Sequence, residues 1–170
     1  MRLRELLQNT PSWLKSLLSP PTKALELVKR REGLELRWYK DSLGKTTGGY
    51  GHLQQPHERD MVVTKELAEQ WLAEDMQVAM KAARLQATKL PFSSQEIEDV
   101  LVSVNFQLGT GWTEKFPKTW GLMMSGKYEE AAWEAENSLW AKQTPVRVRD
   151  LQRALWRLSL LYEVSSLVDA

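Results

Sequence analysis

The chain has 170 residues, of which 42% are hydrophobic and 26% charged, so it can bury a core as one domain or two small lobes. It has no cysteine, which excludes disulfides and thiolate metal sites, and its two histidines are too few for a zinc site without several carboxylates. No apolar run approaches the roughly 20 residues of a membrane-spanning helix. The net charge of +1 hides an asymmetry, because residues 1–31 carry +5 and the remainder carries −4.

Residues 1–21 are expected to form a basic, amphipathic N-terminal extension. Its leucines recur at helical spacing, but Pro11 and the prolines at 20 and 21 interrupt any continuous helix. A solvated tail, packing on the body and contact with a partner all fit this pattern. The functional alternative is a weak contact with an anionic membrane or lipopolysaccharide. The uncharged stretch 16–22 is too short for a signal-peptide core, so synthesis in a cytosol is expected.

A small lobe with a helix and a hairpin is predicted over residues 22–63. The expected elements are a helix over 22–32, strands over 36–40 and from 46, and a third short strand over 52–54. Gly33 is placed to end the helix, so Glu32 would lie at the negative end of the helix dipole, where dipole and partial burial both raise a carboxyl pKa. Gly48, Gly49 and Gly51 disfavour a plain strand and allow close approach of a ligand or a neighbouring element.

The rest of the chain is predicted to be helical. The longest pattern runs over residues 64–88, roughly 36 Å, which is enough to join two lobes. Ser93–Glu96 forms a predicted capping box, and Phe92 and Ile97 form a hydrophobic staple around it. The helix that this box starts is expected to run to Phe106 and to be ended by Gly109, and further helices are expected over 115–124, 127–137 and 145–162. The predicted fold class is therefore α+β: a small N-terminal lobe with a three-stranded sheet, a joining helix, and an all-helical lobe over 89–162, within one domain over 22–170.

Two carboxylates flank the predicted hairpin. Glu32 precedes its first strand, Asp41 follows that strand, and Thr47 leads into a glycine-rich stretch that ends in His52. Hydrolysis of a glycosidic bond needs such a pair, because one carboxyl group protonates the leaving oxygen while the other stays ionised to activate water. Most pairs of a glutamate and an aspartate at such a spacing are solvated surface residues. The prediction of a catalytic pair therefore rests on the ordered arrangement of helix end, hairpin, threonine and glycines.

This arrangement resembles the T4-type phage lysozymes (endolysins). The matching positions are Glu32-Gly33-Leu34, Tyr39-Lys40-Asp41, Thr47 and Gly49-Tyr50-Gly51-His52-Leu53, without a gap, followed by Asn105–Gly109, Tyr128–Ala132, Trp140 and Gln143–Arg147. The resemblance covers roughly residues 22–162 in the same order. It implies the lysozyme-like fold predicted above.

The resemblance also implies roles for individual residues. Glu32 would be the general acid, Asp41 would assist the attacking water, and Thr47 would hold that water, with inversion at the sugar carbon and no cofactor or metal. The substrate-binding positions that it implies are Leu53, Phe106, Gln107, Thr119 and Glu134, with His52 and Arg147 in support. Three positions depart from the family: Glu134 replaces an asparagine, Leu43 an acidic hairpin residue, and Gly48 an isoleucine.

Structural roles compete with several of these assignments. His52 is expected to be a hydrogen-bonding histidine within the small lobe or beside an acid. Gln107 and Arg147 are equally expected to satisfy backbone or carboxylate partners. The tryptophans expected in the core, rather than stacked on sugar, are Trp71, Trp133 and Trp156.

The implied activity is hydrolysis of the β-1,4 bond between N-acetylmuramic acid and N-acetylglucosamine in bacterial peptidoglycan, by a monomer, for host cell lysis. The protein would stay in the host cytoplasm until a holin-type lesion gave it access to the wall. No nucleic-acid partner is expected, because the body is net acidic and has no basic stripe. Lytic transglycosylase chemistry is an alternative that needs the acid but not Asp41 and Thr47. A non-catalytic wall-binding or virion protein is another, which retention of all three residues disfavours.

Overall fold

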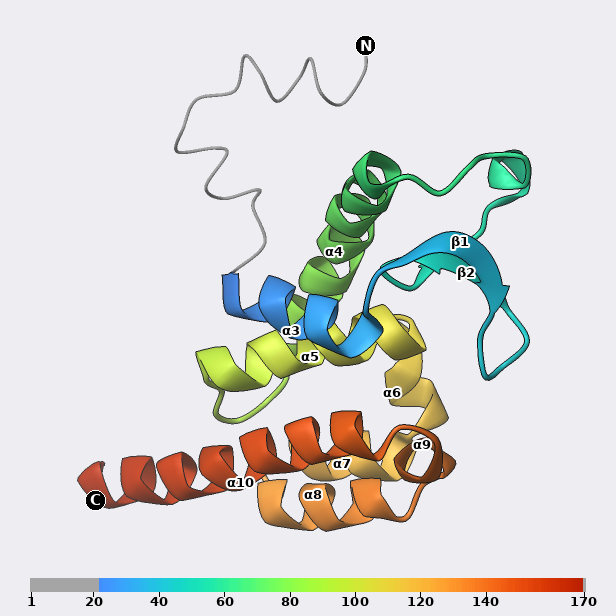
Figure 1. Cartoon of the computed structure of the whole chain (residues 1–170). Helices are drawn as coiled ribbons and strands as arrows, with labels where there is room; N and C mark the ends of the chain where they lie inside the picture. Colours follow the sequence, from blue (N-terminus) through green and yellow to red (C-terminus); the bar gives the residue numbers. More distant parts are fainter. Residues whose placement is uncertain (1–21, 170) are drawn as a thin grey trace, which may run out of the picture.

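The computed structural model describes residues 22–169, so the predicted N-terminal extension lies outside the described residues. The elements, in chain order, are α3 (Thr22–Glu32), β1 (Glu35–Lys40), β2 (Thr46–Gly49), β3 (His52–Leu53), the 3-10 helix η1 (Pro56–Glu58), α4 (Lys65–Thr88), α5 (Gln95–Leu108), α6 (Trp112–Lys115), α7 (Pro117–Met124), α8 (Tyr128–Glu136), α9 (Leu139–Gln143) and α10 (Pro145–Val168). The predicted α+β class is confirmed (Figure 1).

The three strands form one antiparallel sheet in the order β1-β2-β3. Gly48 and Gly49 belong to β2, but the strand is not a plain one, because Gly49 has φ +62° and the β1–β2 pairing shifts register between Glu35 and Tyr39. A Cβ on Gly48 would lie 2.8 Å from the Trp38 ring, and one on Gly49 would lie 3.1 Å from the Cβ of Ala68 in α4. The absence of side chains therefore lets Trp38 and α4 pack directly against the strand.

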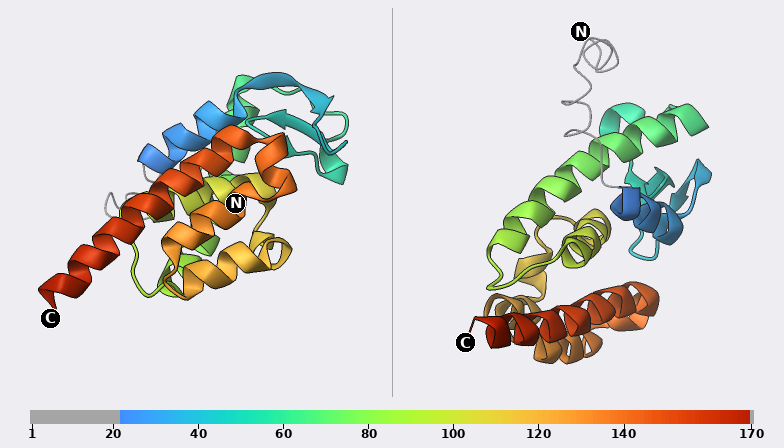
Figure 2. Two further views of the ribbon diagram at one scale, coloured as in Figure 1. Left: turned by 90° about the horizontal axis from the view of Figure 1, so that it is seen from below. Right: turned by 90° about the vertical axis from the view of Figure 1, so that its left-hand side faces the viewer.

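The long helix α4 links the sheet to the helical part of the molecule, as predicted (Figures 1 and 2). It begins after Thr64, whose hydroxyl accepts a hydrogen bond from Leu67 N at 3.2 Å. Its buried face includes Trp71 under the sheet and Met76 and Met80 against the helical core. One continuous helix thus fixes the sheet relative to the other helices.

Helix α5 runs through the middle of the helical part and is buried almost all round, from Ile97 to Asn105. Its N-cap is Ser94, whose Oγ accepts from Ile97 N at 3.2 Å, so the capping box predicted to start at Ser93 was wrong. Glu96 therefore does not complete the box. It pairs with Arg157 of α10 instead.

Helix α3 runs antiparallel to α10, since its last residues contact the first turns of α10. Arg31 makes two hydrogen bonds to Asp150, at 2.7 and 2.8 Å, and Glu32 contacts Arg147. In the left view of Figure 2 the two helices run in nearly opposite directions. Because β1 begins three residues after α3 ends, this pairing brings the start of α10 close to the beginning of the sheet.

Three sequence predictions about the helices need correction. The helix expected over 115–124 is two helices, because Phe116 leaves helical geometry before Pro117 (φ −122°, ψ 63°). Helix α10 extends to Val168 rather than ending near 162. Trp71 is buried as predicted, but Trp133 is 55% exposed and contacts the half-buried Trp156 ring at 5.7 Å.

Candidate active site

Glu32 is the last residue of α3, and its carboxylate is held in a mostly buried position. Its side chain is 17% exposed, and Oε1 accepts a 2.6 Å hydrogen bond from Arg147 Nη2. Burial and the negative charge of Asp41 raise the pKa of Glu32, whereas the charge and hydrogen bond of Arg147 lower it. Burial is the largest of these effects, so the net pKa of Glu32 is raised. Gly33 ends the helix with φ +69° and donates to Lys29 O, as predicted. Glu32 thus has the properties of a proton donor.

Gly51 lies directly against the Glu32 carboxylate. Its φ is +65°, and a Cβ on it would overlap Glu32 Oε2 and lie 2.7 Å from Cδ. Both the backbone conformation and the contact therefore require glycine here. The predicted close approach at this glycine is made by the general-acid candidate itself.

Asp41 begins the turn between β1 and β2, and the turn fixes its side chain. Oδ1 accepts hydrogen bonds from Leu43 N at 2.9 Å and Lys45 N at 2.8 Å. Within the described residues Oδ2 accepts none, so it remains available. Because the Asp41 charge acts on the pKa of Glu32, the two carboxylates share one electrostatic environment.

Thr47 lies in the middle strand, paired with Tyr39 on one side and Leu53 on the other. It is 6% exposed. Within residues 22–169, two buried side-chain polar atoms have no hydrogen-bond partner: Thr47 Oγ1 and Arg147 Nη1. Both belong to the candidate site, where a polar ligand can satisfy them.

A cavity of about 370 Å³ lies beside this cluster. Gly51 and Leu53 line it from the sheet, and Phe106 lines it from α5. The structure therefore brings Leu53 and Phe106, two predicted substrate-binding residues, to the glycine that contacts Glu32. The half-exposed Leu53 offers its apolar side chain to a ligand.

The other three predicted substrate-binding residues do not line this cavity. Gln107 donates to Thr144 Oγ1 at 3.1 Å and accepts from Trp140 Nε1 at 2.9 Å, so its amide is engaged within the helical part. Thr119 is 5% exposed in α7, and Glu134 is partly exposed on α8. Their substrate contacts stay predictions.

His52 has the structural surroundings expected of it. Nδ1 contacts Asp75 Oδ2 of α4 at 2.7 Å, Nε2 contacts Glu58 Oε2 at 3.0 Å, and the ring stacks on Trp71 at 4.5 Å. Burial lowers the pKa of His52, but the hydrogen bonds and charges of Asp75 and Glu58 outweigh it, and the net pKa is raised. The two acids were not predicted as site residues, because nothing local in the sequence links them to His52.

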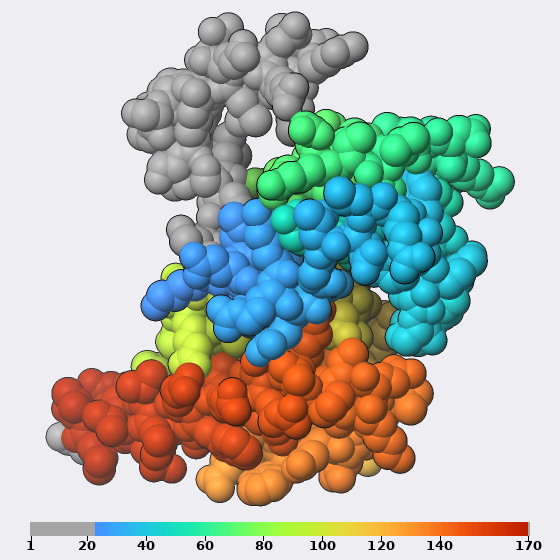
Figure 3. Space-filling view, in the orientation of Figure 1, coloured from blue at the N-terminus to red at the C-terminus, as the bar shows by residue number. Residues whose placement is uncertain are grey.

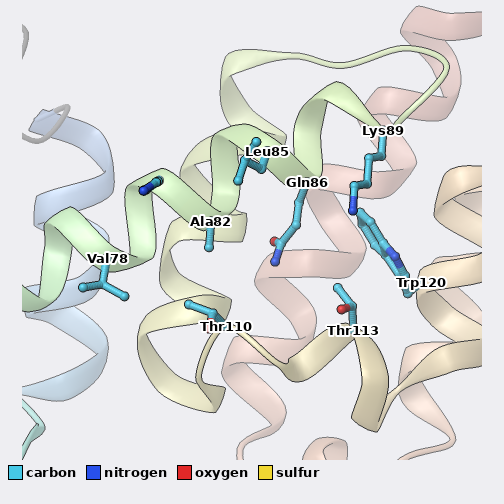
Figure 4. Close-up of a pocket in the computed structure, with 9 residues that line it drawn as sticks. Val78, Ala82, Leu85, Gln86, Lys89, Thr110, Thr113 and Trp120 are labelled. Atoms are coloured by element: carbon cyan, nitrogen blue, oxygen red, sulfur yellow. The ribbon is translucent and has the colours of Figure 1, made fainter.

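A larger cavity of about 520 Å³ lies along α4, as Figure 4 shows. Its lining includes Val78, Leu85, Lys89 and Trp120, and no carboxylate. It adjoins the smaller cavity, since both are lined by Val78 and Thr110. None of the predicted catalytic residues lines it, so the candidate site stays at Glu32.

Among the described residues, no cluster of three or more His, Asp or Glu side chains could hold a metal ion. Over the same part of the chain, no helix has the length and apolar character needed to cross a membrane.

Comparison with known proteins finds similarities both to individual proteins and to a protein family. The chain is 39% identical over 88 residues to an endolysin of Acyrthosiphon pisum secondary endosymbiont phage 1, covering 51% of the chain and 58% of that protein. It is 29% identical over 154 residues to the pre-baseplate central spike protein Gp5 of Enterobacteria phage T4, covering 76% and 27% respectively. It is 26% identical over 148 residues to probable T4-type lysozyme 1 of Dictyostelium discoideum, covering 72% and 86%. The chain thus spans less than two thirds of the endolysin and of the spike protein.

The chain also matches a protein family as a whole. The sequence model described as phage lysozyme matches residues 29–154, a range that contains Glu32, Asp41, Thr47 and Arg147. The chain therefore belongs to the phage lysozyme family.

Proposed function

We propose that the protein is an N-acetylmuramidase that hydrolyses the β-1,4 bond between N-acetylmuramic acid and N-acetylglucosamine in bacterial peptidoglycan. The observation that carries this proposal is Glu32, a mostly buried carboxyl group with a raised pKa, coupled to Asp41 and bonded to Arg147. Membership of the phage lysozyme family supports a glycosidase of this kind.

In this mechanism Glu32 gives its proton to the glycosidic oxygen as the bond between that oxygen and C1 breaks. The raised pKa keeps a fraction of Glu32 protonated nearer neutral pH than an ordinary glutamate would be. Arg147 then stabilises the carboxylate that remains. The leaving sugar departs with a free 4-hydroxyl group.

Asp41 accepts a proton from a water molecule whose oxygen bonds to C1. Its free Oδ2 and its fixed turn suit that role. Thr47 Oγ1, buried without a partner among the described residues, suits the task of holding the water. Attack by water opposite the leaving group inverts C1, which requires carboxyl groups roughly 6.5–9.5 Å apart. Proton and water suffice for this reaction, so it needs no cofactor.

The substrate would enter along the cavity between Leu53 and Phe106. Gln107, Thr119 and Glu134 are proposed as further contacts on the strength of the family resemblance. Residues 22–170 would make up the catalytic domain, and residues 1–21 an extension that touches an anionic membrane or lipopolysaccharide weakly.

The biological setting we propose is host lysis by a monomeric endolysin that reaches the wall from the cytoplasm through a holin-type lesion. The similarity to a phage endolysin supports this. The similarity to a baseplate spike protein favours a second setting, in which the same chemistry is carried by a virion.

The test is mass spectrometry of peptidoglycan digested by the wild-type chain and by Glu32→Gln. We expect reducing muropeptides from the wild type, and a rate lower by about 10²–10⁴-fold for the variant. Glu26→Gln, an exposed change on the same helix, is the matched control and should act as wild type. A 1,6-anhydro-muramic product would identify a lytic transglycosylase, and undiminished cleavage by Glu32→Gln would remove the catalytic assignment.

A further inference from the structure

The last turns of α10 present an apolar stripe to solvent. It has five members, and the last four follow the first by one, four, seven and eight positions. This spacing places all five on one face of the helix. With their exposed fractions they are Leu160 (64%), Leu161 (50%), Val164 (57%), Leu167 (76%) and Val168 (78%). We call this set the α10 stripe. A contiguous apolar surface of this kind marks an interaction site.

The stripe is not the face by which α10 joins the core. In the same turns Leu158 is fully buried, and the Tyr162 ring packs against Phe92 and Tyr128 at 5.7 and 5.6 Å. The helix is therefore anchored on one side and apolar on a second side.

Earlier along α10 this second side is exposed and charged, with Arg149, Arg153 and Arg157 on it. Asp150 pairs with Arg31 of α3, and Arg157 pairs with Glu96 at the start of α5. Steps of seven, four and three residues lead from Asp150 through Arg157 and Leu161 to Val164, so all four share one face. The stripe thus continues, beyond Arg157, a face that meets α3 and α5 through charged pairs, and the last turns of α10 lie at the surface of the molecule (Figure 3).

The chain enters α3 close to where the stripe begins. Helix α3 runs antiparallel to α10, from Thr22 towards the Arg31–Asp150 pair (Figure 2). Burial raises the pKa of Asp99 in α5, and the nearby charge of Lys23 opposes that rise. Asp99 lies one turn after Glu96, which pairs with Arg157. Residues before Thr22 therefore join the body near the level of Arg157, one turn before Leu161.

The composition of residues 1–21 matches the stripe. Its apolar residues at helical spacing are Leu3, Leu6, Leu7, Trp13, Leu14, Leu17 and Leu18. It carries three basic residues and one acid, whereas α10 after Arg157 and its C-cap carry two acids, Glu163 and Asp169, and no basic residue. The stripe spans roughly 12 Å, and 21 residues span about 31 Å even as a helix, so the segment is long enough to reach it.

We propose that residues 1–21 dock on the α10 stripe of the same molecule, with leucines against the stripe and basic residues towards Glu163 and Asp169. A second copy is a poorer occupant, because five side chains fall short of the roughly 20–30 residues a side of a stable interface. An anionic bilayer is poorer too, because the acids would face like charge. Docking occupies the leucines that a membrane contact would need, so the two states exclude each other.

The test uses the full chain, which has no cysteine of its own. Leu167→Cys and Val62→Cys place one thiol each at positions of equal exposure in residues 22–169, both 76%. The rate of reaction with uncharged iodoacetamide is measured for each and divided by its rate in urea. We expect the Leu167→Cys thiol to react about tenfold more slowly than the Val62→Cys thiol. This factor corresponds to an undocked form, with the thiol accessible, in about one tenth of the molecules. Adding Leu14→Asp and Leu17→Asp should abolish this protection.

Four outcomes would overturn the proposal. Equal rates would show the stripe to be bare. Protection that grows with protein concentration would assign it to a second copy, and protection that needs added anionic vesicles would assign it to lipid. Protection that survives Leu14→Asp and Leu17→Asp would exclude residues 1–21 as the cover. Thermal melts of each variant confirm that the body is folded, and the test is independent of the proposed activity.

Discussion

Arg147 Nη2 donates a 2.6 Å hydrogen bond to Glu32 Oε1, which joins the start of α10 to the end of α3 across 115 residues of sequence. Both side chains are mostly buried, at 7% and 17% exposure. A charge-assisted hydrogen bond between two mostly buried groups fixes the orientation of the Glu32 carboxylate and also lowers its proton affinity. Arg147 is therefore a positioning residue that opposes the rise in the pKa of Glu32.

Replacing Arg147 by Gln should raise the pKa of Glu32 further, because burial would then act without the opposing charge. If activity requires protonated Glu32, the alkaline limb of the kcat/KM–pH profile should move to higher pH while the maximum rate falls. Arg147→Lys keeps the charge and should move the limb less. A limb that stays in place, or moves to lower pH, in Arg147→Gln would contradict the coupling.

Gly51→Ala should lower activity by about 10²-fold, because its Cβ would displace the Glu32 carboxylate. It should also cost about 1–2 kcal/mol of stability for the left-handed backbone. Gly44→Ala is the matched control, since Gly44 has φ +76° and open space where its Cβ would be. It should show the stability cost in urea unfolding with activity retained. Equal activity losses in both variants would point to backbone strain alone.

Thr47→Val should separate activity from stability. The Thr47 hydroxyl is buried without a partner among residues 22–169, so its loss should leave the free energy of unfolding unchanged or raise it by up to about 1 kcal/mol. Hydrolysis should fall by about 10²-fold if this hydroxyl positions the water. Thr46→Val removes a hydroxyl that accepts a bond from Lys40 instead, and should keep its activity. Wild-type rates from Thr47→Val would argue against the water-holding role.

The His52 network should make stability depend on pH. A raised folded pKa means that the folded chain retains the proton longer, so this stability is fully present below pH 6.5 and lost as pH rises through the folded pKa. His52→Asn should cost about 3 kcal/mol at pH 5.5 and less at pH 8.5, measured by denaturant unfolding. Glu58→Gln should cost more than Asp75→Asn, because Glu58 is 5% exposed and Asp75 35%. His57 is 77% exposed and its Nε2 lies 3.7 Å from Glu58 Oε1, so His57→Asn is the comparison and should change stability less than His52→Asn. An equal pH effect there would refute the assignment.

Local signals in the sequence were sufficient for much of the fold. Thr64 and Gly33 mark helix ends through bonds within a few residues, and Asp41 fixes its own turn in the same way. These interactions do not depend on the rest of the chain, so the pattern of helices and strands could be predicted. Trp133 shows where this fails, since helical spacing predicts an apolar position but not whether a neighbour covers it.

By itself, the sequence determined the order of elements and the separation of Glu32, Asp41 and Thr47 along a helix end and a hairpin, because both follow from short-range geometry. Tertiary packing alone decided that Arg147 meets Glu32, that Asp75 and Glu58 flank His52, and that residues 22–169 leave an apolar face at the far end of α10 exposed. All three features result from the way in which whole helices pack against one another. Such contacts depend on burial and on partners distant in sequence, for which local patterns carry no signal.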